Sequence, residues 1–264
     1  MLGGSSLKDD LKRTIAVILE YDGTRYSGFQ IQANSETIQS EVESALLKLT
    51  GEEIRIVGSG RTDSGVHALH QVVSFSTRSG IPVERYPYAL NSVLPLDIRV
   101  VGSFLPEEGF HPRFSAVEKV YEYHMLTRQY PSALLRDRCW HLPHPLDTDA
   151  MRDAAERLSG THDFGAFMAS GSSVRDKVRH ISISELYHQD DRLVYRVSAN
   201  GFLYNMVRII VGTLVHIGRG KAASSVIEEM LETGRRELGG KTAPPHGLYL
   251  VYVDYGEEPP RSSP

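Results

Sequence analysis

The chain has 264 residues, of which 41% are hydrophobic and 23% charged, and its formal net charge is −4 at pH 7. This composition is typical of a folded globular protein and excludes collagen-like, disordered and disulfide-stapled chains. The single cysteine, Cys139, cannot form an internal disulfide, and a four-cysteine zinc site is excluded. Because such cysteine usage fits a reducing compartment, we expect a cytoplasmic protein.

The charge is unevenly distributed along the chain. The negative sum argues weakly against a nucleic-acid partner, since phosphates are neutralised by lysine and arginine. However, residues 55–80 carry three arginines and one aspartate, and residues 205–221 carry two arginines, one lysine and no acid. Acidic residues gather instead over 228–232 and 254–258. A basic cleft on an acidic body is therefore compatible with the sequence.

In the first half of the chain, apolar periodicity and turn residues predict a mixture of strands and helices. The predicted elements are a strand over 15–21, a helix over 37–49, strands over 54–57 and 71–77, a helix over 83–93 and a strand over 98–104. Thr37 is suited to cap the first helix and Gly51 to end it. Residues 1–12 lack the apolar core of a signal peptide, and we expect a disordered tail there.

The second half repeats this order loosely. Its predicted elements are a strand over 119–126, a helix over 147–159, an antiparallel pair over 181–187 and 193–199, helices from about 201 and over 223–233, and a strand over 248–255. Since strands and helices mix without strict alternation, we predict an α+β fold with a largely antiparallel mixed sheet and two similar halves. The predicted division is an N-terminal half over 13–106, a C-terminal half over 107–256 and a tail over 257–264.

The most unusual segment is the glycine-rich loop over 58–68, in which three glycines surround Arg61 and Asp63 between two apolar strands. Glycine allows a ligand to approach the backbone closely, and loops held by a rigid sheet often carry function. A tight turn with both charged side chains solvated is the alternative interpretation. A phosphate-binding loop is rejected, because Val66 and His67 stand where it needs lysine and then serine or threonine. The dinucleotide fingerprint also fails on its glycine spacing.

Histidines give no convincing site. His67 and His70 precede a predicted strand, and no cysteine or acidic cluster completes a metal-binding set with them. His141 and His144 are equally isolated, and nothing marks a serine as activated for nucleophilic catalysis.

The longest apolar stretch, 202–217, is interrupted by polar residues and is short for a membrane span, so we expect a buried helix and no membrane partner. Arg208 lies within it. A buried arginine needs a carboxylate partner, because an unpaired buried charge costs several kcal/mol. Asp63 is the most interesting candidate, and a positioned anionic carboxylate is a nucleophile. The alternative is that Arg208 extends its head group to solvent.

Two tyrosines, Tyr121 and Tyr123, alternate on one face of the strand predicted over 119–126. Aromatic rings on a sheet can stack with nucleobases. Packing of both rings in the core is the more ordinary alternative, and at most one of them need face a ligand.

Together these segments resemble the tRNA pseudouridine synthase A family. The resemblance covers most of the chain in the family's order. Two residues depart from the family's pattern: Phe29 stands where tryptophan is frequent, and Ser64 where alanine is frequent. Both bear on the fine positioning of the substrate. The matching motifs are YDGT (21–24), YSGFQ (26–30), GRTDSGVHA (60–68), FSA (114–116), KVYEY (119–123), NGFL (200–203), NMVR (205–208), VGT (211–213), APP (243–245) and GLYL (247–250).

The resemblance implies isomerisation of uridine to pseudouridine in the tRNA anticodon stem-loop, at positions 38 to 40, by an aspartate and without a cofactor or metal. Asp63 matches the catalytic aspartate, and Arg208 matches the arginine that pairs with it. Arg61 matches the residue that opens the base stack and holds the flipped nucleotide. Tyr121 matches the tyrosine that stacks on the target base, and Leu248 an apolar wall of the pocket. The resemblance also implies a homodimer with tRNA across both subunits.

Two other interpretations stay open at the level of the sequence. A non-catalytic RNA-binding module would use the tyrosines alone, and a structural or interaction domain would have no basic groove. The role of a basic cluster, Arg175, Lys177 and Arg179, is also open, because these residues suit either phosphate contacts or a solvated loop.

Overall fold

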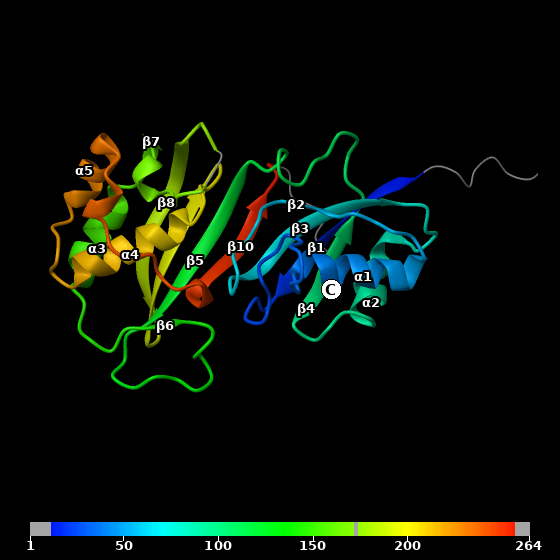
Figure 1. Cartoon of the computed structure of the whole chain (residues 1–264), viewed down its shortest axis with the longest axis horizontal. Helices are drawn as coiled ribbons and strands as arrows, with labels where there is room; N and C mark the ends of the chain where they lie inside the picture. The colour runs from blue at the N-terminus through cyan, green and yellow to red at the C-terminus, as the bar shows by residue number, and fades with distance from the viewer. Residues whose placement is uncertain (1–11, 172–173, 257–264) are drawn as a thin grey trace, which may run out of the picture.

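One continuous sheet joins both halves of the chain (Figure 1). The computed structural model describes residues 12–171 and 174–256, so the tails predicted at 1–12 and 257–264 lie outside the described residues, except for residue 12. The strand order is β4-β1-β3-β10-β5-β9-β8-β7, with β2 paired to β3 and β6 paired to β5. The strands are β1 (Arg13–Tyr21), β2 (Val57–Gly58), β3 (His67–Thr77), β4 (Ile98–Phe104), β5 (Glu118–Leu126), β6 (Trp140–His141), β7 (Gly160–Asp163), β8 (Val178–Gln189), β9 (Arg192–Ala199) and β10 (Leu248–Asp254).

The α-helices of the described residues fall into two groups, one in each half of the chain (Figure 1). They are α1 (Ile38–Thr50), α2 (Tyr86–Asn91), α3 (Thr148–Glu156), α4 (Met206–Gly218) and α5 (Val226–Thr233). Short 3-10 turns η1 (Val83–Arg85), η2 (Gly165–Phe167), η3 (Arg236–Leu238) and η4 (Pro245–Gly247) lie in the connections. The described part of the chain contains no helix long and apolar enough to cross a membrane.

The last strand of the chain lies in the middle of the sheet. β10 runs parallel to β3, where Tyr249 pairs with His67, and antiparallel to β5, where Leu248 pairs with Tyr123. All other pairs of the described sheet are antiparallel except β5 with β6. The prediction of an α+β fold with a largely antiparallel mixed sheet is therefore confirmed.

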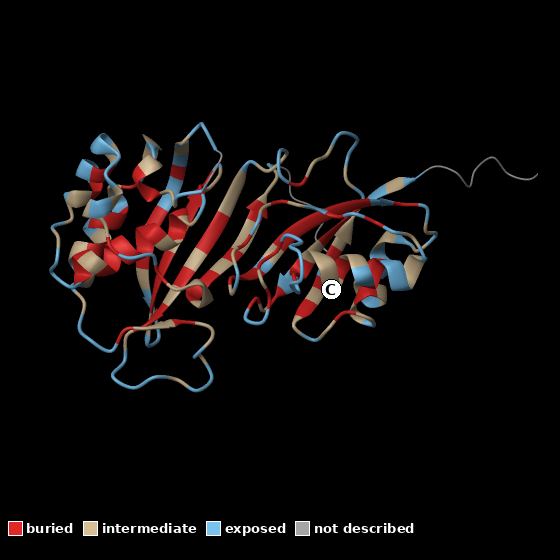
Figure 2. Ribbon diagram, viewed as in Figure 1, coloured by how far each residue is buried: buried red, intermediate tan, exposed pale blue. Residues whose placement is uncertain are grey.

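The core follows the strands and the apolar faces of the helices (Figure 2). Helix α4 is buried along most of its length, as its sequence predicts. Helix α1 has the predicted ends: the Thr37 side chain accepts a hydrogen bond from the Ser40 amide, and Gly51 closes the helix in the left-handed region at φ 72°. These ends depend on local chemistry, which is why the sequence predicts them.

Several predicted boundaries differ from the structure, and two of them have clear physical reasons. The strand expected over 54–57 is reduced to β2, because side chains of α1 bind the backbone instead: Ile56 N donates to Glu43 Oε1 (3.1 Å) and Ile56 O accepts from Gln39 Nε2 (3.4 Å). The helix expected from about 201 begins only at Met206, after Asn205 adopts a left-handed φ of 59°. Two short strands, β6 beside β5 and β7 beside β8, were also not predicted from the sequence.

Candidate active site

The loop aspartate and the helix arginine meet where the two halves of the chain join. Arg208 Nη1 donates to Asp63 Oδ2 at 3.1 Å, and the two side chains are 17% and 28% exposed, respectively. Arg208 is itself fixed, because its Nε donates to Ala243 O (2.8 Å) and its Nη1 also donates to Asn205 Oδ1 (2.8 Å). The ion pair expected from the sequence is thus present. No other hydrogen bond to the Asp63 carboxylate comes from the described residues, so Oδ1 is unengaged by them.

The segment after β1 packs against the glycine-rich loop over 58–68, which carries Asp63 and is called the aspartate loop below. The backbone of Phe29 donates to Thr62 O (3.1 Å), and Ser64 Oγ donates to Tyr26 O (3.1 Å). Gly28, at φ 91°, lies so close that a Cβ there would sit 2.8 Å from Thr62 O. This close approach needs glycine, because an L side chain would collide with the loop and would also be strained at that φ.

The loop is also tied to the sheet beneath it. The Tyr21 hydroxyl and Thr62 Oγ1 are 2.8 Å apart, and both side chains are buried. Burial, opposed by hydrogen bonds to Thr62 and Gln71, raises the pKa of Tyr21 to about 12. Gln71 Nε2 donates to Gly60 O at 2.9 Å, and the Ser59 hydroxyl bonds to Gln71 Oε1. The residues directly before Asp63 therefore have fixed positions, which helps to hold Asp63 in place.

Tyr121 lies near Asp63, and Leu248 lies on the strand that pairs with that of Tyr121. Tyr121 is 8% exposed, and its ring meets the edge of Phe202 at 5.0 Å between centroids. Burial, and then the neighbouring Tyr21 and Asp63, raise the pKa of Tyr121 above its ordinary value. Leu248 is 6% exposed and lies at the start of β10, opposite Tyr123 of the same sheet. Tyr123 is fully buried and donates to Pro244 O, so it packs in the core.

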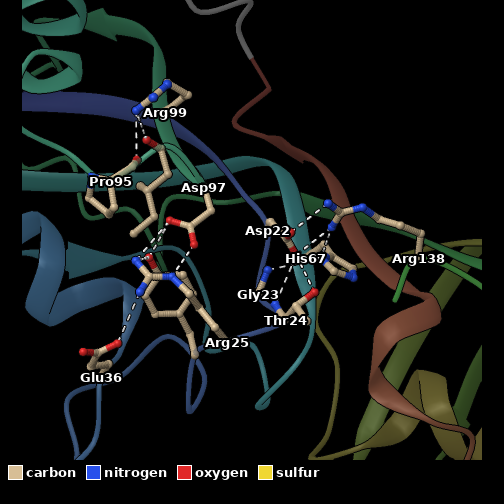
Figure 3. Close-up of polar contacts among 12 residues, drawn as sticks. Asp22, Gly23, Thr24, Arg25, Glu36, His67, Pro95, Asp97, Arg99 and Arg138 are labelled. Carbon is tan, nitrogen blue, oxygen red and sulfur yellow. Dashed lines mark hydrogen bonds and ion pairs between the residues drawn. The ribbon is translucent and has the colours of Figure 1, made fainter. Parts of the chain in front are cut away.

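A second polar network fixes the turn after β1 (Figure 3). The Asp22 carboxylate binds both terminal nitrogens of Arg138, with N–O distances of 2.6 and 2.7 Å. It also accepts hydrogen bonds from the amide and the hydroxyl of Thr24. Although partial burial opposes ionisation, the bonds from Arg138 and Thr24 hold the pKa of Asp22 far below its usual range. Gly23 N donates to His67 Nδ1 at 3.1 Å, and His67 Nε2 lies 2.9 Å from Asp137 O. His67 is thus a buried structural group, with its pKa lowered mainly by burial.

The remaining predicted residues lie at the periphery. Arg61 is exposed and makes no side-chain hydrogen bond or ion pair with the described residues. Of the basic cluster, Arg179 lies over Gly201, where a Cβ would be 3.5 Å from its Nε, and Lys177 lies beside Gly165. Arg175 is exposed.

Two hollows occur beside the connection over 127–139. One, of about 430 Å³, lies against Asp22 and Asp97, and the other, of about 350 Å³, against Trp140 and Pro244. Neither is lined by Asp63. Among residues 12–171 and 174–256, no group of three or more His, Cys, Asp or Glu side chains is arranged to hold a metal ion.

Sequence reasoning missed two residues that hold the loop, Gln71 and Lys119. Lys119 Nζ donates to Ser59 O at 2.6 Å. Each leaves a signal in the sequence: Gln71 is a polar residue at the start of the apolar run QVVSF, and Lys119 stands two positions before Tyr121, on the same strand face. An unexplained polar group on a buried face indicates a specific partner.

The class of protein follows from comparison with known families. The sequence model of the family described as tRNA pseudouridine synthase matches residues 17–115 and 154–256. The matched residues cover more than half of the chain and include Asp63, Arg208 and Leu248. The class is therefore that of the pseudouridine synthases, which are isomerases.

Individual relatives narrow this class. The chain is 47% identical over 243 residues to a tRNA pseudouridine synthase A of Thermoanaerobacter sp. (strain X514), covering 92% of this chain and all of that protein. It is 50% identical over 239 residues to the tRNA pseudouridine synthase A of Bacillus pumilus (strain SAFR-032), covering 90% and 97%. A solved archaeal Nop10–Cbf5 complex of the box H/ACA sRNP is more distant, at 12% identity and TM-score 0.36 over 78% of this chain and 43% of that chain. The chain belongs to the tRNA pseudouridine synthase family, enzymes that isomerise uridine to pseudouridine in tRNA.

Proposed function

We propose that this chain forms pseudouridine in the anticodon stem-loop of tRNA, at positions 38 to 40, with Asp63 as the catalytic residue and with no cofactor or metal. The observation that carries this proposal is the carboxylate itself. One oxygen of Asp63 is held by Arg208, and the other is unengaged among the described residues. A carboxylate that is anionic, fixed in direction and not used up by structural bonds is suited to act as a nucleophile or a base.

The reaction needs no outside oxidant or reductant. The bond between ribose C1′ and uracil N1 breaks, the uracil turns, C1′ bonds to C5, and the C5 proton is lost while N1 gains one. In one route Asp63 attacks C1′ and is later displaced by C5. In the other it removes the proton from C2′ to give a glycal and returns that proton afterwards. Both routes regenerate the carboxylate, and the geometry suits both.

The neighbouring residues suit a flipped base. A uridine inside a stem is out of reach unless it leaves the helix, at a cost of a few kcal/mol. In our proposal Arg61, exposed and free of partners among the described residues, opens the stack and holds the extruded nucleotide. The ring of Tyr121 stacks on the uracil, and Leu248 forms an apolar wall that keeps the detached base from escaping.

Removal of the C5 proton needs a separate acceptor. The raised pKa of Tyr121 keeps its hydroxyl protonated near neutral pH, which favours ring contact over a role as a phenolate base. We therefore assign this proton to water in the proposed mechanism.

We extend the proposal to the assembly. It includes a cytoplasmic homodimer with tRNA lying across both subunits, and a division of each chain into halves over 13–106 and 107–256 that share the site. A dimer would let basic residues of two chains form one groove despite the net charge of −4 on each. Gel filtration with light scattering tests the dimer: a particle with the mass of one chain would contradict it.

The activity has a direct test. Purified protein is incubated with an anticodon stem-loop transcript whose uridines carry tritium at C5, and tritium release to water is measured. We expect release only from transcripts with uridine at positions 38 to 40. A transcript with uridine at positions 38 to 40 that binds but releases no tritium would contradict the proposed function.

A further inference from the structure

Lys119 reaches the aspartate loop from the opposite half of the molecule. It lies on β5, and its Nζ donates to Ser59 O at 2.6 Å. The same nitrogen lies 3.8 Å from the position that a Cβ on Gly60 would take. Residues two apart on a strand share a face, so Lys119 and Tyr121 lie on the same side of β5, roughly 7 Å apart along the strand. Lys119 is therefore a neighbour of the proposed base-stacking ring and of the loop that carries Asp63.

The charge of Lys119 has no counter-ion among the described residues. No carboxylate of the described residues lies within 4 Å of its Nζ, and the charged group that acts on it most is another cation, Arg113. A partly buried ammonium group beside a second cation is unfavourable unless an anion compensates it. Only one of the three ammonium protons is engaged by a described residue, which leaves donors for such an anion.

The surroundings define the chemistry of that anion. Arg61, exposed, directly follows Gly60, and Arg113, also exposed, lies near enough to Lys119 to act on its charge. Arg61 and Arg113 are thus two further cations near Lys119. Because the substrate is a polyanion whose target base must come to Asp63, its backbone is the anion that arrives there. We propose that Lys119 is a substrate-binding residue that contacts a phosphate of the RNA strand next to the flipped uridine.

This inference rests on the proposed function, since it requires RNA at the Asp63 site, and the charge state of Lys119 supports it. Burial, and then Arg113, lower the pKa of Lys119 to about 8. The titratable groups near it are Arg113 and Tyr255, which directly follows β10, lies against Ser59 and donates its hydroxyl proton to Pro112 O. A bound phosphate favours the protonated amine. Above pH 8 the free enzyme loses this proton, so binding of the RNA phosphate should weaken as the pH rises.

A purely structural role makes a different prediction. If Lys119 only holds Ser59 O, its removal resembles the removal of Gln71, which anchors Ser59 and Gly60 without carrying charge. Gln71 is thus a matched control for loop anchoring. Lys48, exposed on α1, is a matched control for the loss of one positive charge.

The experiment compares Lys119→Met, Gln71→Met and Lys48→Met in the full-length protein. Binding of an anticodon stem-loop RNA is measured at several salt concentrations, together with kcat and KM between pH 7 and 9. Circular dichroism melting identifies any variant that fails to fold. If Lys119→Met fails to fold, Lys119→Arg, which keeps the positive charge, replaces it. Lys119→Arg should preserve the salt dependence of binding and remove the rise in KM above pH 8.

We expect Lys119→Met to weaken RNA binding about tenfold and to reduce the slope of log K against log salt by about 0.7 to 0.9. The rise in KM above pH 8 should disappear. Gln71→Met should lower kcat with an unchanged salt slope, and Lys48→Met should change neither. A Lys119→Met enzyme with lower kcat but wild-type KM and salt slope would overturn the inference. Wild-type protein that binds RNA without forming pseudouridine would instead contradict the proposed function.

Discussion

Two aspartate–arginine pairs connect the halves of this molecule, and they differ in what remains available on the carboxylate. Asp63 and Asp22 have the same side-chain exposure, 28%. Asp22 uses both oxygens, on Arg138 and Thr24, and its strongly lowered pKa reflects those bonds. Asp63 uses one oxygen, on Arg208. Burial and ion pairing are therefore similar at the two carboxylates, and in our proposal the oxygen of Asp63 that no described residue engages is what sets the reacting carboxylate apart.

The largest expected effect comes from removing the charge of each aspartate in turn. Asp63→Asn should lower kcat by at least about 10³-fold, the scale seen when a reacting group is lost. Its melting temperature should stay close to that of the wild type, because the asparagine oxygen still accepts a bond from Arg208, which also keeps its bonds to Ala243 O and Asn205 Oδ1. Asp22→Asn should do the reverse: kcat within a few-fold of wild type, with a stability loss of about 1 kcal/mol for a partly exposed pair. Equal losses of kcat in Asp63→Asn and Asp22→Asn would contradict the proposed difference between a catalytic and a structural aspartate.

The arginines sharpen the same contrast. Arg208→Met should lower kcat by about 10²- to 10³-fold, because the carboxylate loses the cation that orients it. Arg138, whose side chain is 40% exposed, is the partner of Asp22. Arg138→Met should therefore lower stability while leaving kcat within a few-fold of the wild type. Steady-state kinetics and thermal melting of both variants give the comparison. An Arg208→Met enzyme of normal rate would show that Asp63 needs no orienting cation.

Close backbone packing against the loop predicts a smaller effect. Gly28→Ala places a side chain at a left-handed φ and brings its Cβ within 2.8 Å of Thr62 O. Gly51→Ala also places a side chain at a left-handed φ, but its Cβ meets no atom within 4 Å. Gly51→Ala should cost about 1 kcal/mol of stability with normal kcat. Gly28→Ala should cost more and also reduce kcat, since the loop around Asp63 must shift. Equal stability costs and normal kcat in both variants would contradict the packing argument.

The smallest expected effect is a dependence of stability on pH at His67, in the network around Asp22. Burial lowers the pKa of His67 in the folded state, so the unfolded chain binds more protons below about pH 6.5. The free energy of unfolding should therefore fall as the pH drops from 6.5 through the folded-state pKa. His67→Gln should flatten this slope in urea titrations. If the slope is as steep in His67→Gln as in the wild type, His67 is not its source.

The sequence predicts those parts of the structure that depend on local chemistry or on a strict physical demand. The ends of α1 follow from Thr37 and Gly51. The Asp63–Arg208 pair follows because an apolar helix with one arginine needs a carboxylate partner. In both cases a single residue has few acceptable environments.

The rest depends on contacts between distant segments. The residues over 201–205 have helical spacing, but they are not helical, and Phe202 packs against Tyr121 of β5. The central position of β10 requires pairing with β3, some 180 residues earlier in the chain. Lys119 and Gln71 were missed for the same reason, because their partner Ser59 lies on another segment. Periodicity carries no information about such pairings.

In our proposal the carboxylate of Asp63, bound by Arg208 through one oxygen only, performs the chemistry. Its most direct test is a single-turnover measurement with Asp63→Asn in excess over C5-tritiated stem-loop RNA, at concentrations where all the RNA is bound. We expect bound RNA to release no detectable tritium and nucleotide analysis to find only uridine. Pseudouridine formed by this variant at a rate within tenfold of the wild type would contradict a catalytic role of Asp63.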